Sequence, residues 1–181
     1  LLNVLDQTVS PMGARMLRRW LVLPLKAQKA IQDRLNIVDY FTHHGDAADE
    51  LVLEIKKMGD LERLISKVAT ARICPREMVQ LKRALNAIVP VVESCSTSKN
   101  KNLVKLASQL NPCDAIREKI ATQIQDDAPV QLIKGNVMAS GVSQELDELR
   151  VISTSAKAYL EEIREREMER TGIPSLKISF N

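Results

Sequence analysis

Aromatic residues are scarce in this sequence, at 3% of its 181 residues, and glycine occurs only six times. Apolar residues as a whole nevertheless make up 45%, which is enough to bury a core and argues against a disordered chain. Leucine, isoleucine, valine, alanine and methionine must build that core, and this composition favours interdigitating helices over sheets made of aromatic and β-branched pairs. We therefore predict an all-α fold, organised as a helical bundle.

Sequence motifs for nucleotide and metal chemistry are also missing. The glycines form neither GxxxxGK[ST] nor GxGxxG, the loops that hold nucleotide phosphates, and neither HExxH nor GxSxG occurs. The two histidines, His43 and His44, are adjacent, so on a helix they point about 100° apart, and no further histidine or cysteine follows one turn away. We predict no catalytic, cofactor-binding or metal-binding residues and conclude that this chain is not itself an enzyme.

The cysteines and the length of the hydrophobic runs indicate the cellular compartment. Cys74, Cys95 and Cys113 are odd in number and far apart, which favours structural thiols in a reducing cytosol. No run approaches the roughly 18 apolar residues that a membrane span needs, so we expect a cytoplasmic protein that does not contact a membrane. The sequence begins without methionine and ends within an apparent strand, and we interpret it as a fragment of a larger protein.

A single long helix is the clearest element, predicted over residues 143–172. Ser143 is placed as its N-cap, and acidic residues follow in the first turn, where the helix dipole favours negative charge. Gly172 suits the left-handed position after the last turn, and Pro174 prevents the helix from resuming. At 1.5 Å per residue such a helix is a rod of roughly 42 Å.

The two halves of this helix differ in character. The first half carries an apolar seam with helical spacing, which predicts packing against other helices; its members include Leu149, Ile152, Ala156, Leu160 and Ile163. From Glu161 onward charged residues cover nearly all faces, so we expect this half to project into solvent. The charges there either form ion pairs within the helix or bind a partner.

The rest of the chain is predicted to contain a helical core over residues 1–125, a hairpin connector over 126–142 around Gly135-Asn136, and a strand beginning in 173–181. Within the core, Ser10, Asp46 and Asp60 are expected to cap helices, with Gly45 ending the helix before Asp46. The three arginines of the first amphipathic helix contact phosphate, form a solvated face, or form ion pairs to neighbouring helices; they are Arg15, Arg18 and Arg19.

Three stretches resemble the core, or lever, domain of the MutS family of DNA mismatch repair ATPases. They are Val4–Leu25 (VLDQTVSPMGARMLRRWLVLPL), Asp60–Leu64 (DLERL) with Pro75–Glu77 (PRE), and Glu145–Arg150 (ELDELR) through Glu165–Lys177 (EREMERTGIPSLK). The resemblance extends over essentially the whole chain. One departure is Gly13-Ala14, where the family more commonly has two glycines.

The resemblance implies a function that the residues alone do not. In that family, levers are long helices that join an ATPase to a clamp closing over duplex DNA. The helix over 143–172 would then be a lever, and 173–181 the first strand of a truncated clamp domain. ATP and magnesium would be bound elsewhere in the parent protein, and the partners would be mismatched duplex DNA, the parent's other domains and a second subunit. Lys177 and Asn181 are the candidate contacts to the DNA backbone.

Two other functions remain open from the residues. One is a free-standing helical adaptor whose exposed arm pairs with a partner helix, and the other is a non-specific DNA-binding module, with which the net charge of +3 is compatible. If the chain is a fragment, apolar surface left by missing domains should also cause artificial self-association. The resemblance to the MutS family also implies that the protein is located in a bacterial cytosol and is associated in function with the nucleoid.

Overall fold

The structure is a computed structural model that describes residues 1–173 and 175–177. The chain divides into two compact units, Leu1–Met138 and Ala139–Asn181. Helices dominate both, which confirms the all-α prediction.

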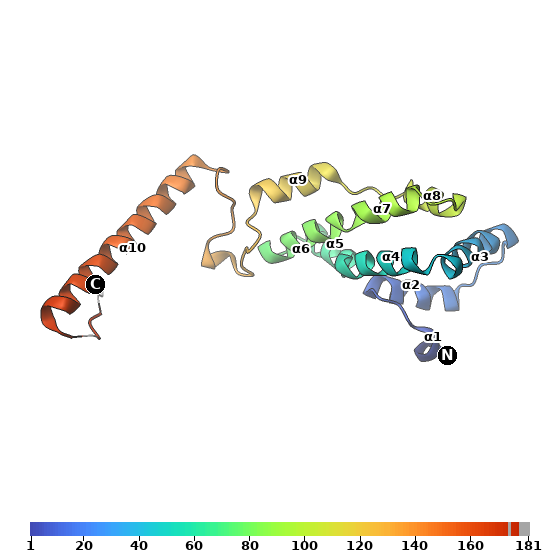
Figure 1. Cartoon of the computed structure of the whole chain (residues 1–181), viewed down its shortest axis with the longest axis horizontal. Helices are drawn as coiled ribbons and strands as arrows, with labels where there is room; N and C mark the ends of the chain where they lie inside the picture. The colour runs from blue at the N-terminus through green and yellow to red at the C-terminus, as the bar shows by residue number, and fades with distance from the viewer. Residues whose placement is uncertain (174, 178–181) are drawn as a thin grey trace. The chain divides into compact units, whose positions relative to one another are not determined.

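The first unit contains nine α-helices and one 3-10 turn among its described residues (Figure 1). In chain order they are α1 (Leu2–Leu5), α2 (Pro11–Val22), α3 (Gln28–His43), α4 (Gly45–Met58), α5 (Leu61–Ala69), α6 (Pro75–Asn86), α7 (Ile88–Ser96), α8 (Lys101–Ala107), α9 (Asp114–Gln123) and η1 (Leu132–Lys134). Helices α6, α7 and α8 follow one another alongside α4 and α3, so that α6 and α7 pack on α4 and α8 packs on α3. Helix α9 covers α6.

Local sequence signals explain where several helices begin. The Ser10 hydroxyl accepts a hydrogen bond from the amide of Gly13, and Pro11 occupies the first helical position of α2. Asp60 caps α5 by accepting from the amide of Arg63. Both caps confirm the sequence prediction.

The junction between α3 and α4 differs from the prediction. Helix α3 ends at His43 and α4 begins at Gly45, so His44 alone separates them and is the N-cap of α4. Gly45 therefore begins a helix instead of ending one, and Asp46 lies inside the first turn, two positions after the cap residue His44. The predicted cap at Asp46 is wrong because the chain re-enters a helix with almost no loop.

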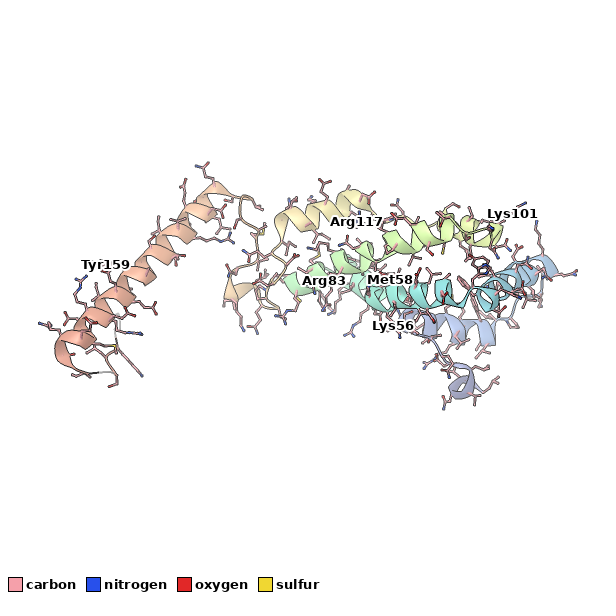
Figure 2. The ribbon with its side chains drawn as sticks, viewed as in Figure 1. Lys56, Met58, Arg83, Lys101, Arg117 and Tyr159 are labelled. Carbon is pink, nitrogen blue, oxygen red and sulfur yellow. The ribbon has the colours of Figure 1, made fainter. Side chains whose placement is uncertain are left out.

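The core of the first unit consists of two apolar clusters. The first joins α4, α7 and α8 and contains Leu51, Val91, Cys95, Leu103 and Ala107. The second joins α5, α6, α9 and the start of α7 and contains Leu64, Leu81, Leu85, Ile88 and Ile120. Met58, the last residue of α4, packs against both clusters (Figure 2). The two clusters therefore form a continuous core along the unit.

The hairpin predicted over 126–142 is wrong, and the described residues contain no strand. Gly135 and Asn136 do take positive φ values of 67° and 57°, as a tight hairpin turn requires. The preceding residues, however, coil into η1 instead of extending, and the backbone beyond the turn forms an isolated bridge between Ile124 and Met138. The connector is thus a loop closed at its base, because Met138 pairs with Ile124, which lies before the loop, and not with a residue across the turn.

The second unit consists mainly of α10 (Gln144–Thr171), a helix of 28 residues. The Ser143 hydroxyl accepts from the amide of Leu146, and Gly172 takes the left-handed conformation with φ 69° at the C-terminal end. Both predicted helix ends are confirmed. The described residues after the helix, Ile173 and 175–177, form no strand, and the remainder of the predicted strand lies outside the described residues. No helix in the described part of the chain has the length and apolar character that crossing a membrane requires.

Candidate functional site

A polar junction joins two of the stretches singled out in the sequence. Arg15 on α2 donates two hydrogen bonds to the carboxylate of Asp60, at 3.1 and 2.7 Å. Its Nε also donates to Glu62 on α5, at 2.8 Å. Arg15 therefore forms ion pairs to a neighbouring helix, which is one of the roles predicted for the arginines of α2. We call Arg15, Asp60, Glu62, Lys67 and Glu77 the polar junction.

Helix α6 enters the junction through Glu77. Its carboxylate accepts a hydrogen bond from the amide of Cys74, at 3.1 Å, and so satisfies a donor at the start of α6. The same carboxylate pairs with Lys67 on α5. One side chain therefore both caps α6 and ties it to α5, the helix that begins within the DLERL stretch.

The charges of the junction stabilise one another. The hydrogen bonds from Arg15 hold the pKa of Asp60 below its ordinary value, and the amide of Arg63 adds to this shift. In return, the hydrogen bonds to Asp60 and Glu62 raise the pKa of Arg15. The hydrogen bond from Lys67, followed by that from the Cys74 amide, lowers the pKa of Glu77. Arg15, Asp60 and Glu77 therefore remain ionised at neutral pH, as an arrangement that joins helices requires.

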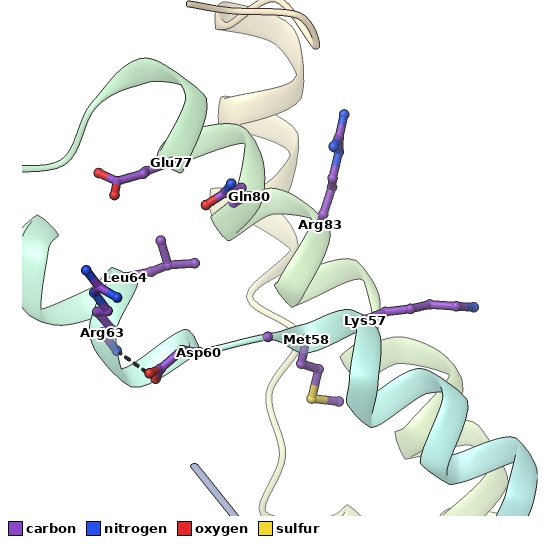
Figure 3. Close-up of a pocket in the computed structure, with 9 residues that line it drawn as sticks. Lys57, Met58, Asp60, Arg63, Leu64, Glu77, Gln80 and Arg83 are labelled. Atoms are coloured by element: carbon purple, nitrogen blue, oxygen red, sulfur yellow. Dashed lines mark hydrogen bonds between the residues drawn. The ribbon is translucent and has the colours of Figure 1, made fainter. Parts of the chain in front are cut away.

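Beside the junction lies a pocket of about 460 Å³ between α4, α5 and α6. Figure 3 shows Glu77 and Gln80 of α6 facing Leu64 and Arg63 of α5 across it, whereas Arg83 and Lys57 point away. The lining contains no histidine, serine or cysteine, and its acidic residues are held in the pairs described above. This arrangement provides no nucleophile beside a general base.

Metal binding has no support in the described part of the chain. No group of three or more histidine, cysteine, aspartate or glutamate residues there is placed to hold a metal ion. The ring Nδ1 atoms of His43 and His44 lie 2.8 Å from the backbone carbonyls of Asp39 and Tyr40, respectively. All three cysteines are free thiols.

The residues proposed for the lever lie on α10, as predicted from their spacing. Leu149, Ile152 and Ala156 are exposed, whereas Leu160 and Ile163 are half-buried. Tyr159 also projects from this helix (Figure 2). The packing of the apolar seam against other helices stays a prediction.

The charged half of α10 is laced by ion pairs within the helix. Arg166 pairs with Glu162 at 3.0 Å and Arg170 with Glu167 at 2.7 Å, spacings of four and three residues. Of the two roles considered for these charges, the structure shows ion pairs within the helix. Of the two candidate DNA contacts, Lys177 is exposed in the turn region after the helix, and Asn181 lies outside the described residues.

One contact was missed by the sequence analysis. The guanidinium of Arg34, on α3, lies 3.6 Å from the ring centroid of Trp20, on α2. Trp20 is the sole tryptophan of the chain, and its place on an amphipathic helix was the available signal. No pattern in the sequence, however, identifies its partner fourteen positions away on another helix.

Comparison with known proteins gives matches over nearly the whole chain. A family model described as MutS domain III matches residues 1–176. The chain is 52% identical to the DNA mismatch repair protein MutS of Bacteroides thetaiotaomicron, 51% identical to that of Parabacteroides distasonis and 50% identical to that of Flavobacterium psychrophilum. Each match includes all of this chain but 21% of the relative. The chain therefore spans about a fifth of the length of the curated relatives that it matches.

Proposed function

The chain belongs to the MutS domain III family, and from that premise we propose that it couples an ATPase to a DNA clamp within a mismatch repair protein. In this proposal α10 is the lever, and the first unit is the base that holds one end of the coupling path. The chain itself carries out no catalysis. ATP and magnesium are bound by other parts of the longer protein, and duplex DNA is gripped by its clamp.

The observation that supports this role most directly is the continuity of α10. It runs for 28 residues, with a side-chain cap at one end and a left-handed glycine at the other. No proline or glycine interrupts it, and these are the usual causes of kinks. At 1.5 Å per residue its length is roughly 42 Å. A helix of that length transmits a rotation from one end to the other, which a flexible loop does not.

The polar junction supports the proposed role of the first unit. A lever works only if its base does not yield, and short helices such as α5, with nine residues, are marginal unless they are capped and packed. Arg15 and Glu77 fix α5 from two sides by charged hydrogen bonds. The apolar core behind them continues through Met58. We infer that these contacts make the bundle stiff enough to serve as a base.

The proposal is tested in a chimaera in which residues 1–181 replace the matching fifth of the Bacteroides thetaiotaomicron protein. Ala156→Pro removes a backbone donor in the middle of α10 and costs about 3 kcal/mol of helix stability, whereas Ala156→Ser is a control that keeps the helix. Binding of a fluorescent mismatched duplex, ATP hydrolysis and ATP-induced release of the duplex are measured separately.

The expected result is that Ala156→Pro keeps DNA binding and ATP hydrolysis but loses the dependence of one on the other. ATP-induced release at the control rate would overturn the lever role. If Ala156→Pro fails to fold, a milder variant in which Ala156 and Ala158 are both glycine softens the same turn at about 1 kcal/mol per residue. That variant should weaken the coupling without abolishing either activity.

Two measurements on the chain of 181 residues test the alternative functions, a DNA-binding module and a helical adaptor. A DNA-binding module would bind duplex DNA as the chain of 181 residues alone, with a log-log salt slope of about −0.9 per neutralised phosphate. Lys177→Ala should then reduce that slope by about one. A free-standing adaptor would instead show a mass that rises with concentration in light scattering. Duplex binding by the chain alone is not expected from a lever. A strict monomer at high concentration would count against the adaptor, and also against the artificial self-association expected of a fragment.

A further inference from the structure

The first unit carries an apolar groove at the end where α2, α3 and α8 gather (Figure 1). Its volume is about 590 Å³. All three helices contribute apolar side chains to its lining, which are Met16 and Trp20 of α2, Ile37 and Val38 of α3, and Leu106 of α8. The groove is distinct from the polar junction, which joins α2 to α5 and α6.

The helices around this groove leave their apolar faces incompletely covered. Helices α2 and α3 contain no buried residue, although both carry apolar residues at helical spacing. Trp20 is 42% exposed, Val38 58% and Leu106 49%. Contiguous apolar surface of this kind is typical of an interaction site, and tryptophan is among the residues that dominate binding energy at such sites.

The charges around the groove indicate what it binds. Arg34 of α3 and Lys105 of α8 line it, together with a single carboxylate, that of Asp33. Among residues 1–173 and 175–177, neither Arg34 nor Lys105 forms an ion pair. Arg34 instead lies over the face of Trp20, where it retains donors for a carboxylate. The lining therefore has a net positive charge beside an apolar floor.

We propose that this groove is the docking surface for an acidic amphipathic helix. Its apolar stripe would cover Trp20, Val38 and Leu106, and carboxylates flanking that stripe would meet Arg34 and Lys105. A groove walled by helices accepts a further helix through anchors spaced by three or four residues. The relatives have most of their length outside the matched region, and a segment there can supply such a helix. This surface does not depend on the lever role.

Trp20 makes the proposal directly testable, because it is the only tryptophan in the chain and lines the groove. The probes are two synthetic helical peptides of about 18 residues, or five turns, that share one leucine stripe and lack tryptophan. One carries glutamate beside the stripe and the other carries lysine. Each is titrated into the chain of 181 residues while the Trp20 emission is recorded.

The acidic peptide should shift the Trp20 emission to shorter wavelength, and the basic peptide should not. Val38→Asp, within the groove, should weaken the acidic peptide by at least about tenfold, as changes at the centre of an interface do. The matched control is Ile116→Asp on α9, where the replaced side chain is 52% exposed but does not line the groove. It should leave binding unchanged.

A charge reversal keeps the test valid if Val38→Asp fails to fold. Lys105→Glu lies at an exposed position and should weaken the acidic peptide while strengthening the basic one. Equal binding of both peptides, or no binding of either, would overturn the proposal. An emission shift with rising protein concentration alone would assign the groove to a second copy of this chain, and a shift with duplex DNA would assign it to nucleic acid; both outcomes would also overturn it.

Discussion

Replacing Asp60 by alanine should destabilise the first unit more than replacing Asp46 by alanine. Both aspartates precede or begin a helix, and sequence patterns alone assign both as caps. In the structure only Asp60 acts as one, by accepting from the amide of Arg63 at 3.2 Å, whereas α4 begins before Asp46 and has no side-chain cap. The two variants therefore separate a cap from an acidic residue in the first turn.

The expected magnitudes follow from the contacts. Loss of an aspartate cap costs about 1 kcal/mol, and Asp60→Ala also removes the two hydrogen bonds from Arg15. Asp46→Ala loses only a favourable interaction with the helix dipole, worth a few tenths of a kcal/mol at an exposed position. For a chain of this size, 1 kcal/mol corresponds to a fall in Tm of about 2–4 °C.

The assay is urea unfolding followed by circular dichroism, with Asp60→Asn as a further variant. Asparagine caps as well as aspartate, so Asp60→Asn keeps the cap and loses only the charge beside Arg15. We expect Asp60→Ala to be the least stable variant, Asp60→Asn intermediate and Asp46→Ala closest to the parent chain. Equal loss in Asp60→Ala and Asp46→Ala would refute the assignment of the cap. A loss in Asp60→Asn as large as that in Asp60→Ala would show that the ion pair, not the cap, matters.

Three further predictions concern the same unit. The folded-state pKa of Glu77 is depressed, so the ionised carboxylate contributes fully to stability above its unfolded pKa of about 4.3. This contribution is lost as the pH falls through the folded pKa. Glu77→Gln keeps a capping group but has no charge to lose, so the variant should lose less stability than the parent chain between neutral pH and pH 3, measured by urea unfolding. Leu85→Ala, in the buried core, should cost about 2–5 kcal/mol in urea unfolding, whereas Leu149→Ala on the exposed face of α10 should cost under about 0.5 kcal/mol. Gly59→Ala should destabilise by about 1 kcal/mol or more because Gly59 has φ 61°, while Gly45→Ala, at a helical position with open space around it, should stabilise by roughly 0.5–1 kcal/mol.

Each of these has an outcome that would contradict it. If Glu77→Gln lost as much stability as the parent chain between neutral pH and pH 3, the ion pair between Glu77 and Lys67 would not contribute to stability. Similar losses in Leu85→Ala and Leu149→Ala would place the core elsewhere. A stabilised Gly59→Ala would mean that Gly59, between α4 and α5, does not take a positive φ.

The helix ends show how much of the fold is encoded locally. Ser10, Asp60 and Ser143 each accept a hydrogen bond from the amide three residues further on, so the sequence around each cap contains all the information needed. The error at Gly45 and Asp46 arose where two helices meet with a single residue between them, because packing of α3 and α4 then decides the boundary. Local rules did not capture that junction.

In the connector over residues 126–142, unlike at the helix ends, contacts distant in sequence decide most of the structure. Gly135 and Asn136 adopt the positive φ values that their residue types favour, so the turn itself was predictable. The predicted strands on either side do not form among the described residues, because strand formation depends on a partner that lies elsewhere in the chain. The bridge from Met138 to Ile124, and not across the turn, is a tertiary choice.

The polar junction and the apolar groove could be predicted only in part. The charged residues of DLERL and PRE are visible in the sequence, but the pairing of Arg15 with Asp60 joins positions 45 residues apart. The same holds for Trp20 and Arg34, which lie on different helices. A single sequence gives residue types and periodicity, whereas these contacts depend on how α2 and α3 are placed in three dimensions.

The central claim is that α10 behaves as one rigid rod, and the distance between its ends tests this most directly. Spin labels at positions 145 and 169, in the chimaera with Cys74, Cys95 and Cys113 replaced along with the relative's own cysteines, are separated by about 36 Å if every residue rises 1.5 Å. We predict a narrow distance distribution near that value, unchanged when ATP and mismatched duplex DNA are added. A broad distribution, or a distance that shortens with nucleotide, would show that the helix bends or melts and would contradict the lever account.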